Sequence, residues 1–485
     1  MRDGLLSVLK SVLLFGFWES LYRRKGKVNG MNETLKSWKR QPLVGKWQYF
    51  CLLVVAVVEL VYMSPQGQKN GLVWVAVDHF LEIPAMASLL LTIARGIRRE
   101  GWSTMLVSLV MLLWISLVQV MRVIRGLEQI NPGEITCFYA LALPLAFAME
   151  DGERQWGLKT LAVVYLLEGL RLCLLAGALY FGILPEGYRA SVFWDGARLL
   201  EMFHPTNCSA LLLISIGLCL GMCLKTKKRW LQVVLIVWIL IQFAVQTLTN
   251  GRTGTVFTCL LIGAALFCGI RKTGWKRAPL ALAAGIAVMA ILFLGSQKLY
   301  SVHQKQMTQS VQQIQPAEGN EPSQEEVQEQ TQPAEQINVQ RSFLQDMFSF
   351  NGRTAIWKAA VKGLAENPKI MVCGTDNVFA VLSENLNFNA LHTHNPFLEV
   401  IYVLGIPGLV LALIITVLAF RGAFIILWRN TDLWKSAVAL SVLCLFGCGL
   451  LEPYLFVAKN NQHYLSIFFL TGVGYLHQWT VKKRK

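Results

Sequence analysis

The sequence predicts an all-α integral membrane protein with about twelve transmembrane helices and one large extracytoplasmic loop. Of its 485 residues, 54% are hydrophobic and only 15% are charged, whereas soluble domains carry about 25% charged residues. The apolar residues come in long blocks, and a helix that crosses a bilayer needs roughly 20 of them. Basic residues recur in alternate loops, as they do in cytoplasmic loops. Together these observations exclude an ordinary water-soluble enzyme.

Each predicted span is an apolar block of about bilayer length. The blocks run approximately over 47–64, 72–94, 103–121, 133–149, 158–181, 206–224, 230–248, 254–270, 278–296, 396–420, 434–455 and 463–480. The first nine make up one segment, 47–296, and the last three make up 396–480. Between these two segments lies the large loop.

Ionisable residues inside a span usually face a cavity or a charged partner. The block 72–94 contains Asp78 and Glu82, four residues apart on one helix face, and His79 lies between them. We therefore expect Asp78 and Glu82 to contact substrate. Glu168 and Arg171, three residues apart in a later span, predict an intramembrane ion pair.

Loop charge gives an independent prediction of sidedness. The chain carries 45 Lys and Arg against 29 Asp and Glu, a net charge of +16. The basic clusters all fall on one predicted side, at 23–27, 95–99, 225–229, 271–277, 421–435 and 482–485. An even number of spans with both termini in the cytoplasm explains this pattern. The positive charge therefore requires no nucleic acid partner.

The chain ends are expected to lie on the cytoplasmic side. The N-terminal segment 1–46 contains an apolar stretch, 5–18, that is shorter than a span and is interrupted by Lys10. We expect an interfacial helix on the inner leaflet, with a thirteenth span as the alternative. A signal peptide is not favoured, because the basic cluster follows the apolar stretch instead of preceding it. Residues 481–485 form a basic cytoplasmic tail.

The large outer loop divides into two parts. Residues 297–350 include a stretch rich in Gln, Glu and Pro that has too few apolar residues to form a core, and disorder is expected there. Residues 351–395 differ, because RTAIWKAAVKGLAENP has amphipathic helical spacing and ends at Pro368. The second part is therefore expected to be ordered and to pack over the bundle.

Three basic features lie next to the predicted outer surface: Arg252, Arg353 and the pair His392 and His394. Each alone has an ordinary explanation, since an interfacial arginine snorkels to lipid headgroups and an exposed helix carries solvated arginines. The histidine pair has no carboxylate or cysteine at metal-ligand spacing, so a metal site is not predicted. Together, two arginines and a histidine suit a lipid pyrophosphate, because guanidinium binds phosphate oxygens in a bidentate manner and histidine accepts protons near neutral pH.

The order of these motifs resembles the O-antigen ligase and O-antigen polymerase family of membrane glycosyltransferases. An arginine lies in TLTNGRTGT, the ordered loop begins with GRTAIW, and LHTHN leads into FLEVIYVLGIPGLV. NPKIMVCGTDN departs from the family pattern, because it keeps Pro368 but only one glycine of the usual turn, Gly374. The resemblance implies a GT-C-like fold and inverting transfer of undecaprenyl-pyrophosphate-linked glycan, on the outer face, to a glycan, lipid or protein acceptor. It implies neither a metal nor a cofactor.

The resemblance also implies residue roles. Arg252 and Arg353 would bind the pyrophosphate, and His394 would act as the general base or orient the acceptor. Further residues near the same surface are expected to bind substrate: His392, Asn395, Glu399 and Glu452. Glu452 lies in LLEPYL at the outer end of the predicted span 434–455.

Several functions remain open at this stage. A polymerase and a ligase are not distinguished, and a protein O-oligosaccharyltransferase is a further alternative. A flippase or transporter of lipid-linked sugars would need charges along a central path, whereas the candidates gather at the outer surface. A structural or sensory protein with a partner-binding outer loop would leave the arginine and histidine arrangement unexplained.

Overall fold

A computed structural model describes part of the chain at the level of individual residues. The described residues are eight positions between 110 and 124, then 151–181, 183, 193–194, 198–199, 205–314, 353–375, 377–386, 390–429, 432–456 and 463–481. The predicted N-terminal segment and Asp78 and Glu82 lie outside them, as do the first two predicted spans and the fourth. The same is true of residues 315–350 of the outer loop.

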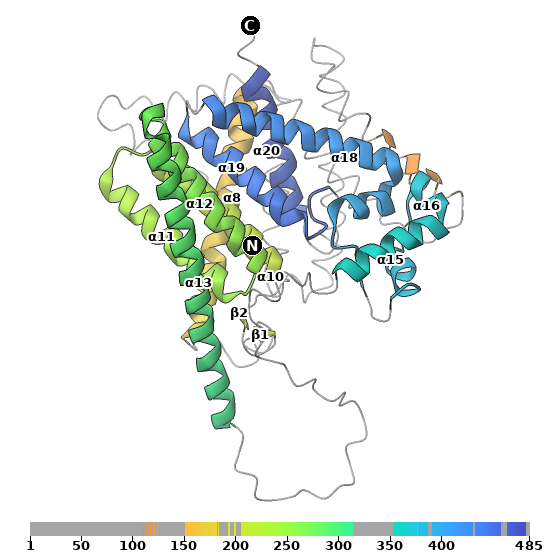
Figure 1. The fold of residues 1–485 in the computed structure, drawn as a ribbon, viewed down its shortest axis with the longest axis horizontal. Coiled ribbons are helices and arrows are strands. Elements are labelled where there is room, and N and C mark those ends of the chain that lie inside the picture. Colours follow the sequence, from red (N-terminus) through yellow and green to blue (C-terminus); the bar gives the residue numbers. More distant parts are fainter. Residues whose placement is uncertain are drawn as a thin grey trace, which may run out of the picture.

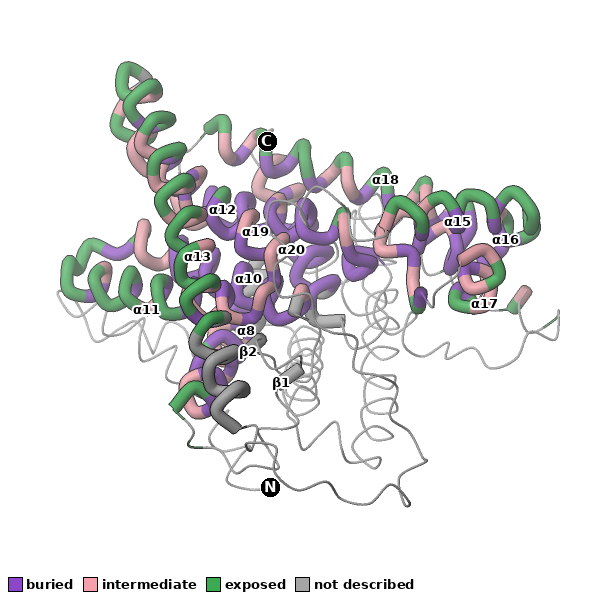
Figure 2. The backbone as a smooth tube through the Cα atoms, turned by 60° about the horizontal axis from the view of Figure 1, so that its bottom comes forward, coloured by how far each residue is buried: buried purple, intermediate pink, exposed green. Residues whose placement is uncertain are grey.

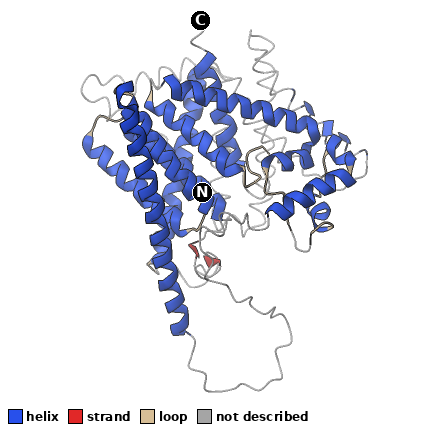
Figure 3. Cartoon of the chain, viewed as in Figure 1, coloured by secondary structure: helices blue, strands red, loops and turns tan. Residues whose placement is uncertain are grey.

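The described part is almost entirely helical (Figures 1 and 3). The helices of the bundle are α8 (Asp151–Tyr180), α10 (Pro205–Lys225), α11 (Arg229–Leu248), α12 (Arg252–Arg271), α13 (Ala278–Ile314), α18 (Pro396–Arg429), α19 (Leu433–Gly449) and α20 (His463–Val481). A short 3-10 turn, η1 (Trp275–Arg277), precedes α13, and β1 (Phe193–Trp194) pairs antiparallel with β2 (Arg198–Leu199). Their bounds agree with the predicted spans to within a few residues at most ends.

Six of the described helices are long and apolar enough to cross a membrane: α8, α10, α11, α12, α13 and α18. In α10, 83% of the apolar window is buried, whereas in α13 only 11% is buried. Figure 2 shows the same contrast between the enclosed α10 and the exposed α13. An apolar helix that is exposed in this way suits a lipid-facing position, because lipid covers the surface that protein leaves open.

Two sets of contacts identify the two ends of the bundle. At one end, Arg271 of α12 donates hydrogen bonds to the carbonyls of Leu427 and Trp428 near the end of α18. At the other end, Gln246 of α11 donates to the carbonyl of Ser209 in the first turns of α10, at 2.7 Å. The first end carries the basic loops and is therefore the predicted cytoplasmic end.

Several polar side chains inside the bundle make hydrogen bonds or ion pairs between or within helices. Gln246 also donates to the hydroxyl of Thr258 on α12 at 2.9 Å, so that it links three helices. Arg171 Nε lies 2.9 Å from Glu168 Oε2, which confirms the predicted ion pair. The described cysteines are thiols, and all of them except Cys223 are buried.

The second part of the outer loop forms a small helical layer. It consists of α15 (Arg353–Glu366), α16 (Pro368–Cys373) and α17 (Val378–Ser383). The predicted amphipathic helix is therefore confirmed, with its end just before Pro368. Its buried face packs against the start of α18, where the hydroxyl of Tyr402 donates to the carbonyl of Ala360 at 2.7 Å.

The helix α18 is interrupted at Gly405, which has φ 71° and ψ −173°. As a whole, α18 contacts both α16 of the outer layer and the bundle helices α19 and α20 (Figure 1). The backbone also approaches α16 closely, because a Cβ on Gly405 would lie 2.6 Å from the carbonyl oxygen of Val372. Glycine is required there by both the positive φ and the close approach.

The structure differs from the sequence prediction at the start of the outer loop. Disorder was expected from residue 297, but α13 continues as a helix to Ile314. The physical reason is local: residues 297–314 contain neither glycine nor proline and are rich in Gln and Lys, which favour helix. Pro316 follows two residues after the helix ends.

Candidate functional site

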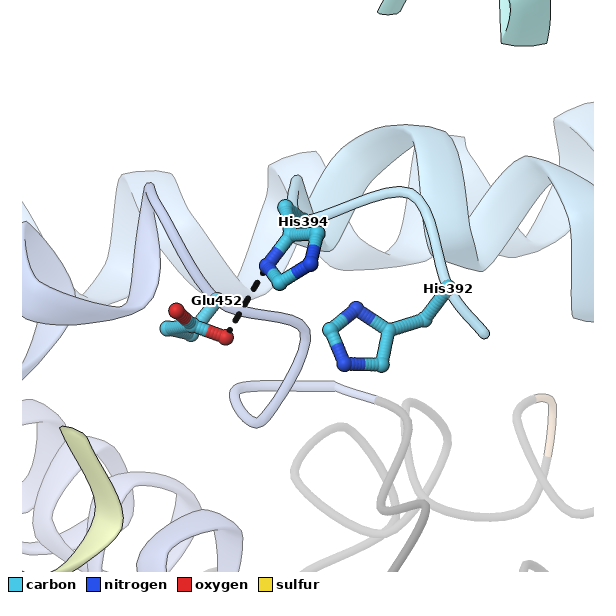
Figure 4. Close-up of side chains that lie close together, drawn as sticks. All are labelled: His392, His394 and Glu452. Carbon is cyan, nitrogen blue, oxygen red and sulfur yellow. Dashed lines mark hydrogen bonds and ion pairs between the residues drawn. The ribbon is translucent and has the colours of Figure 1, made fainter. Parts of the chain in front are cut away.

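Three charged or titratable side chains meet at the predicted outer end of the bundle. Arg353 Nη2 lies 2.8 Å from Glu452 Oε1, and His394 Nδ1 lies 3.3 Å from Glu452 Oε2. The three residues come from the start of α15, the loop before α18 and the turn after α19. Figure 4 shows Glu452 pointing toward His394, with His392 beside them.

Glu452 is held by the turn in which α19 ends. Its backbone N–H donates to the carbonyl of Gly449 at 3.2 Å, and its own carbonyl accepts from Tyr454 N–H at 3.0 Å. The side chain is only 3% exposed. A buried carboxylate needs charged or hydrogen-bonding partners, and Arg353 and His394 supply one to each oxygen.

His394 lies in a loop that its two neighbours anchor. Thr393 donates from both its backbone N–H and its hydroxyl to Glu399 Oε2, each at 2.9 Å. Asn395 Oδ1 accepts from the N–H groups of Phe397 and Leu398 at 3.0 and 3.1 Å, which caps the start of α18. The ring of His394 is therefore directed by a fixed backbone.

The backbone of His394 is itself unusual. Its φ is +50°, and among the described residues only Asn250 shares a positive φ without being glycine. A left-handed histidine costs energy, and such conformations gather at functional sites. The two positions lie at the same end of the bundle, one in the histidine loop and one two residues before Arg252.

His392 lies against His394, with ring centroids 4.0 Å apart. His392, His394 and Glu452 each offer one ligand atom, and these atoms all lie within 4.8 Å of one another. The local sequence has no carboxylate at metal-ligand spacing from the histidine pair. The fold supplies one from 58 residues beyond His394.

Arg353 and Arg252 are both placed at this end, but in different ways. Arg353 is the first residue of α15, and its side chain is 17% exposed. Arg252 is the first residue of α12, and its Nε donates to Asn250 Oδ1 at 3.1 Å. The Cys448 thiol lies 4.0 Å from the carbonyl oxygen of Thr253, so α12 starts beside the last turn of α19.

Two predicted substrate-binding residues, Glu399 and Asn395, also make structural contacts. Glu399 is fully buried and holds Thr393, while Asn395 caps α18. Both therefore position the histidine loop. Sequence reasoning missed Thr393, which links His394 to Glu399; its place between two histidines was the available signal. Neither the Arg353–Glu452 pair nor its geometry had a signal in the sequence.

Comparison with known proteins identifies a domain that contains most of these residues. A family model described as O-Antigen ligase matches residues 237–413. The match includes Arg252, Arg353 and the histidine loop, and it ends before Glu452. A search of curated proteins finds no match. With six described helices able to span a bilayer, the chain is a multi-pass membrane protein that carries an O-antigen ligase domain at residues 237–413.

Proposed function

We propose that this protein transfers an undecaprenyl-pyrophosphate-linked oligosaccharide to a hydroxyl acceptor on the outer face of the cytoplasmic membrane. The acceptor is a growing glycan or a lipid, so the enzyme is a polymerase or a ligase of surface polysaccharide biosynthesis. Both termini then lie in the cytoplasm. The observation that carries the proposal is the contact of Glu452 with both Arg353 and His394.

The carboxylate prepares His394 to accept a proton. When the Nδ1–H of His394 donates to Glu452 Oε2, the lone pair of the neutral ring lies on Nε2. A histidine held in one tautomer by a carboxylate is an effective general base. The acceptor hydroxyl would therefore bind on the Nε2 side of the ring.

Arg353 and Arg252 supply the positive charge for the leaving group. Arg353 uses one nitrogen for Glu452, and guanidinium has five N–H donors, so further donors are available for phosphate oxygens. Because guanidinium stays protonated, it offsets the charge that develops on a departing pyrophosphate without a metal ion. The side chains thus provide both positioning and electrostatic stabilisation.

The proposed step is a single displacement. The acceptor oxygen forms a bond to the anomeric carbon, the bond from that carbon to the pyrophosphate oxygen breaks, and the configuration inverts. The acceptor proton moves to His394, and undecaprenyl pyrophosphate leaves with the bonding electrons. His392 borders the same space, and Asp78 and Glu82 remain predicted contacts of the substrate.

A reconstituted transfer assay tests the proposal. Protein in liposomes receives undecaprenyl-pyrophosphate oligosaccharide and an acceptor glycan, lipid or protein. Longer glycans or a glycosylated acceptor, with release of free undecaprenyl pyrophosphate, are expected. Movement of the donor across the bilayer without any transfer would instead show a flippase. Transfer only to a protein acceptor would show a protein O-oligosaccharyltransferase.

A further inference from the structure

We propose that His392, His394 and Glu452 form a binding site for a divalent transition-metal cation, Zn²⁺ foremost, and that the bound cation blocks glycan transfer. The binding site stands on the geometry of the three side chains. Only the inhibition rests on the proposed function.

The three donors match a known ligand set in number and kind. Two imidazoles and one carboxylate form the protein ligands of many zinc sites, which leave a fourth position open. The donor atoms lie within 4.8 Å of one another, and all three side chains converge on one space in Figure 4. His392 is only half-buried, so a movement of its ring toward the other two donors would bring all three within reach of one cation.

One distance fits a cation especially well. His394 Nδ1 and Glu452 Oε2 are 3.3 Å apart, which is longer than the usual N–H···O separation of about 2.9–3.0 Å. Two ligands bound tetrahedrally at about 2.0–2.1 Å from zinc are themselves separated by roughly 3.3–3.4 Å. The pair therefore already has the spacing that zinc requires.

The donor chemistry selects the class of cation. Imidazole nitrogen suits Zn²⁺, Co²⁺ and Cu²⁺, whereas Mg²⁺ and Ca²⁺ prefer oxygen ligands in larger numbers. Two of the three donors here are nitrogens. We therefore expect the site to discriminate strongly against Mg²⁺ and Ca²⁺.

The surroundings hold the ligands in place. Arg353 binds Oε1 of Glu452 and leaves Oε2 directed at His394, and Glu399 fixes the loop through Thr393. Such outer contacts orient the ligands of metal sites. The charge of Arg353 opposes a second cation nearby, so the bound metal is expected to be exchangeable by a chelator.

A cation bound at this site would remove both the hydrogen bond that orients His394 and the ability of His394 to act as a base. A cation on His394 Nδ1 and Glu452 Oε2 displaces the hydrogen bond that sets the tautomer, and its charge makes the ring a much poorer base. Transfer should therefore fall when Zn²⁺ is added and recover when the chelator removes it.

Cobalt binding to the full-length purified protein tests the site directly. Protein purified without a polyhistidine tag is first treated with a chelator and then titrated with Co²⁺ in detergent. Intense visible absorption, typical of four-coordinate Co²⁺, and one cation per chain are expected. His392→Asn should weaken binding by more than about tenfold, since even changes to outer contacts cost roughly 10–100-fold. His477→Asn, on α20 at the opposite end of the bundle, is the matched control.

Absence of the cobalt bands in wild type, or equal affinity of wild type and His392→Asn, would overturn the metal site even if the protein transfers glycan. Cobalt binding without any transfer activity would keep the site and overturn the proposed function. If both Co²⁺ and Zn²⁺ bind but Zn²⁺ does not change the rate of glycan transfer, the proposed inhibition is wrong.

Discussion

Arg353 and Glu452 are 99 residues apart in the sequence, and their side chains form an ion pair of 2.8 Å. The pair joins the first residue of the outer helical layer to the turn that ends α19. It is shielded from water, because the side chains are 17% and 3% exposed. Removing one partner of a buried pair leaves the other charge uncompensated, which typically costs about 3–5 kcal/mol. Loss of this pair is therefore expected both to destabilise the outer helical layer and to disturb the carboxylate that contacts His394.

Glu452→Gln is expected to abolish most transfer activity. The amide oxygen can accept from Arg353, but the amide nitrogen then donates to His394 Nδ1 and places the proton on Nε2. A base in the wrong tautomer should lower kcat by roughly 10²–10⁴-fold. Glu452→Asp keeps a carboxylate and is expected to lose less. Steady-state kinetics in liposomes compares the two, and equal losses would contradict the tautomer argument.

Two substitutions of Arg353 distinguish the effect of its positive charge from the effect of its planar guanidinium group. Arg353→Ala should reduce transfer by about 10²–10³-fold, the range for loss of one donor to a developing negative charge. Arg353→Lys keeps the charge but loses the planar fork, so an intermediate loss is expected, with a raised KM for the lipid donor. Lys362→Ala on the same helix is the control, because the Lys362–Glu366 pair is exposed and contributes little. A Lys362→Ala loss as large as that of Arg353→Ala would refute the assignment.

His394→Asn is expected to remove the base and preserve the fold. Asparagine tolerates the left-handed conformation that His394 adopts at φ +50°, while its amide cannot accept the proton. Activity should fall by roughly 10²–10⁴-fold. His394→Ala should lose the same activity and also unfold more easily, by about 1 kcal/mol, because alanine is strained there. Thermal unfolding followed by tryptophan fluorescence distinguishes the two variants, and full activity in either would disprove the role of His394.

The junction of α16 with α18 depends on two glycines. A Cβ on Gly374, at φ +67°, would lie 2.3 Å from the carbonyl oxygen of Val403, and Gly405 is similarly confined. Gly374→Ala and Gly405→Ala should each lower the free energy of unfolding by about 1–3 kcal/mol or more and make the outer layer easier to cleave with protease. Gly177→Ala in α8 is the control, since nothing lies within 4 Å of its Cβ. Unchanged protease sensitivity of both junction variants would contradict this account.

Much of the architecture was predictable because its signals are local. The described spans were visible as apolar blocks, and α15 was visible from its amphipathic spacing and Pro368. The ion pair of Glu168 with Arg171 followed from helical geometry alone. The break at Gly405 was not predictable, because it lies inside a continuous apolar run and depends on the approach of α16 from elsewhere in the chain.

The candidate site was predictable only in its parts. Arg252, Arg353 and His394 were identified from residue chemistry and motif order, and Glu452 was identified only as a residue at the outer surface. The structural contacts of two predicted substrate-binding residues were not foreseen: Glu399 accepts from Thr393 of the histidine loop, and Asn395 accepts from Phe397 at the start of α18. Side-chain partners of this kind depend on rotamers and packing, which the order of residues does not specify.

The sequence by itself determined where the described membrane helices lie, which end of the bundle carries the basic loops and which side chains can bind phosphate or move a proton. These properties follow from the hydropathy, charge and residue types along the sequence. Tertiary structure alone decided that Glu452 holds Arg353 with one oxygen and faces His394 with the other, while His392 lies beside them. The physical reason is that a buried carboxylate must be paired, and only the packing of α15, α18 and α19 brings partners from 99 and 58 residues away within reach.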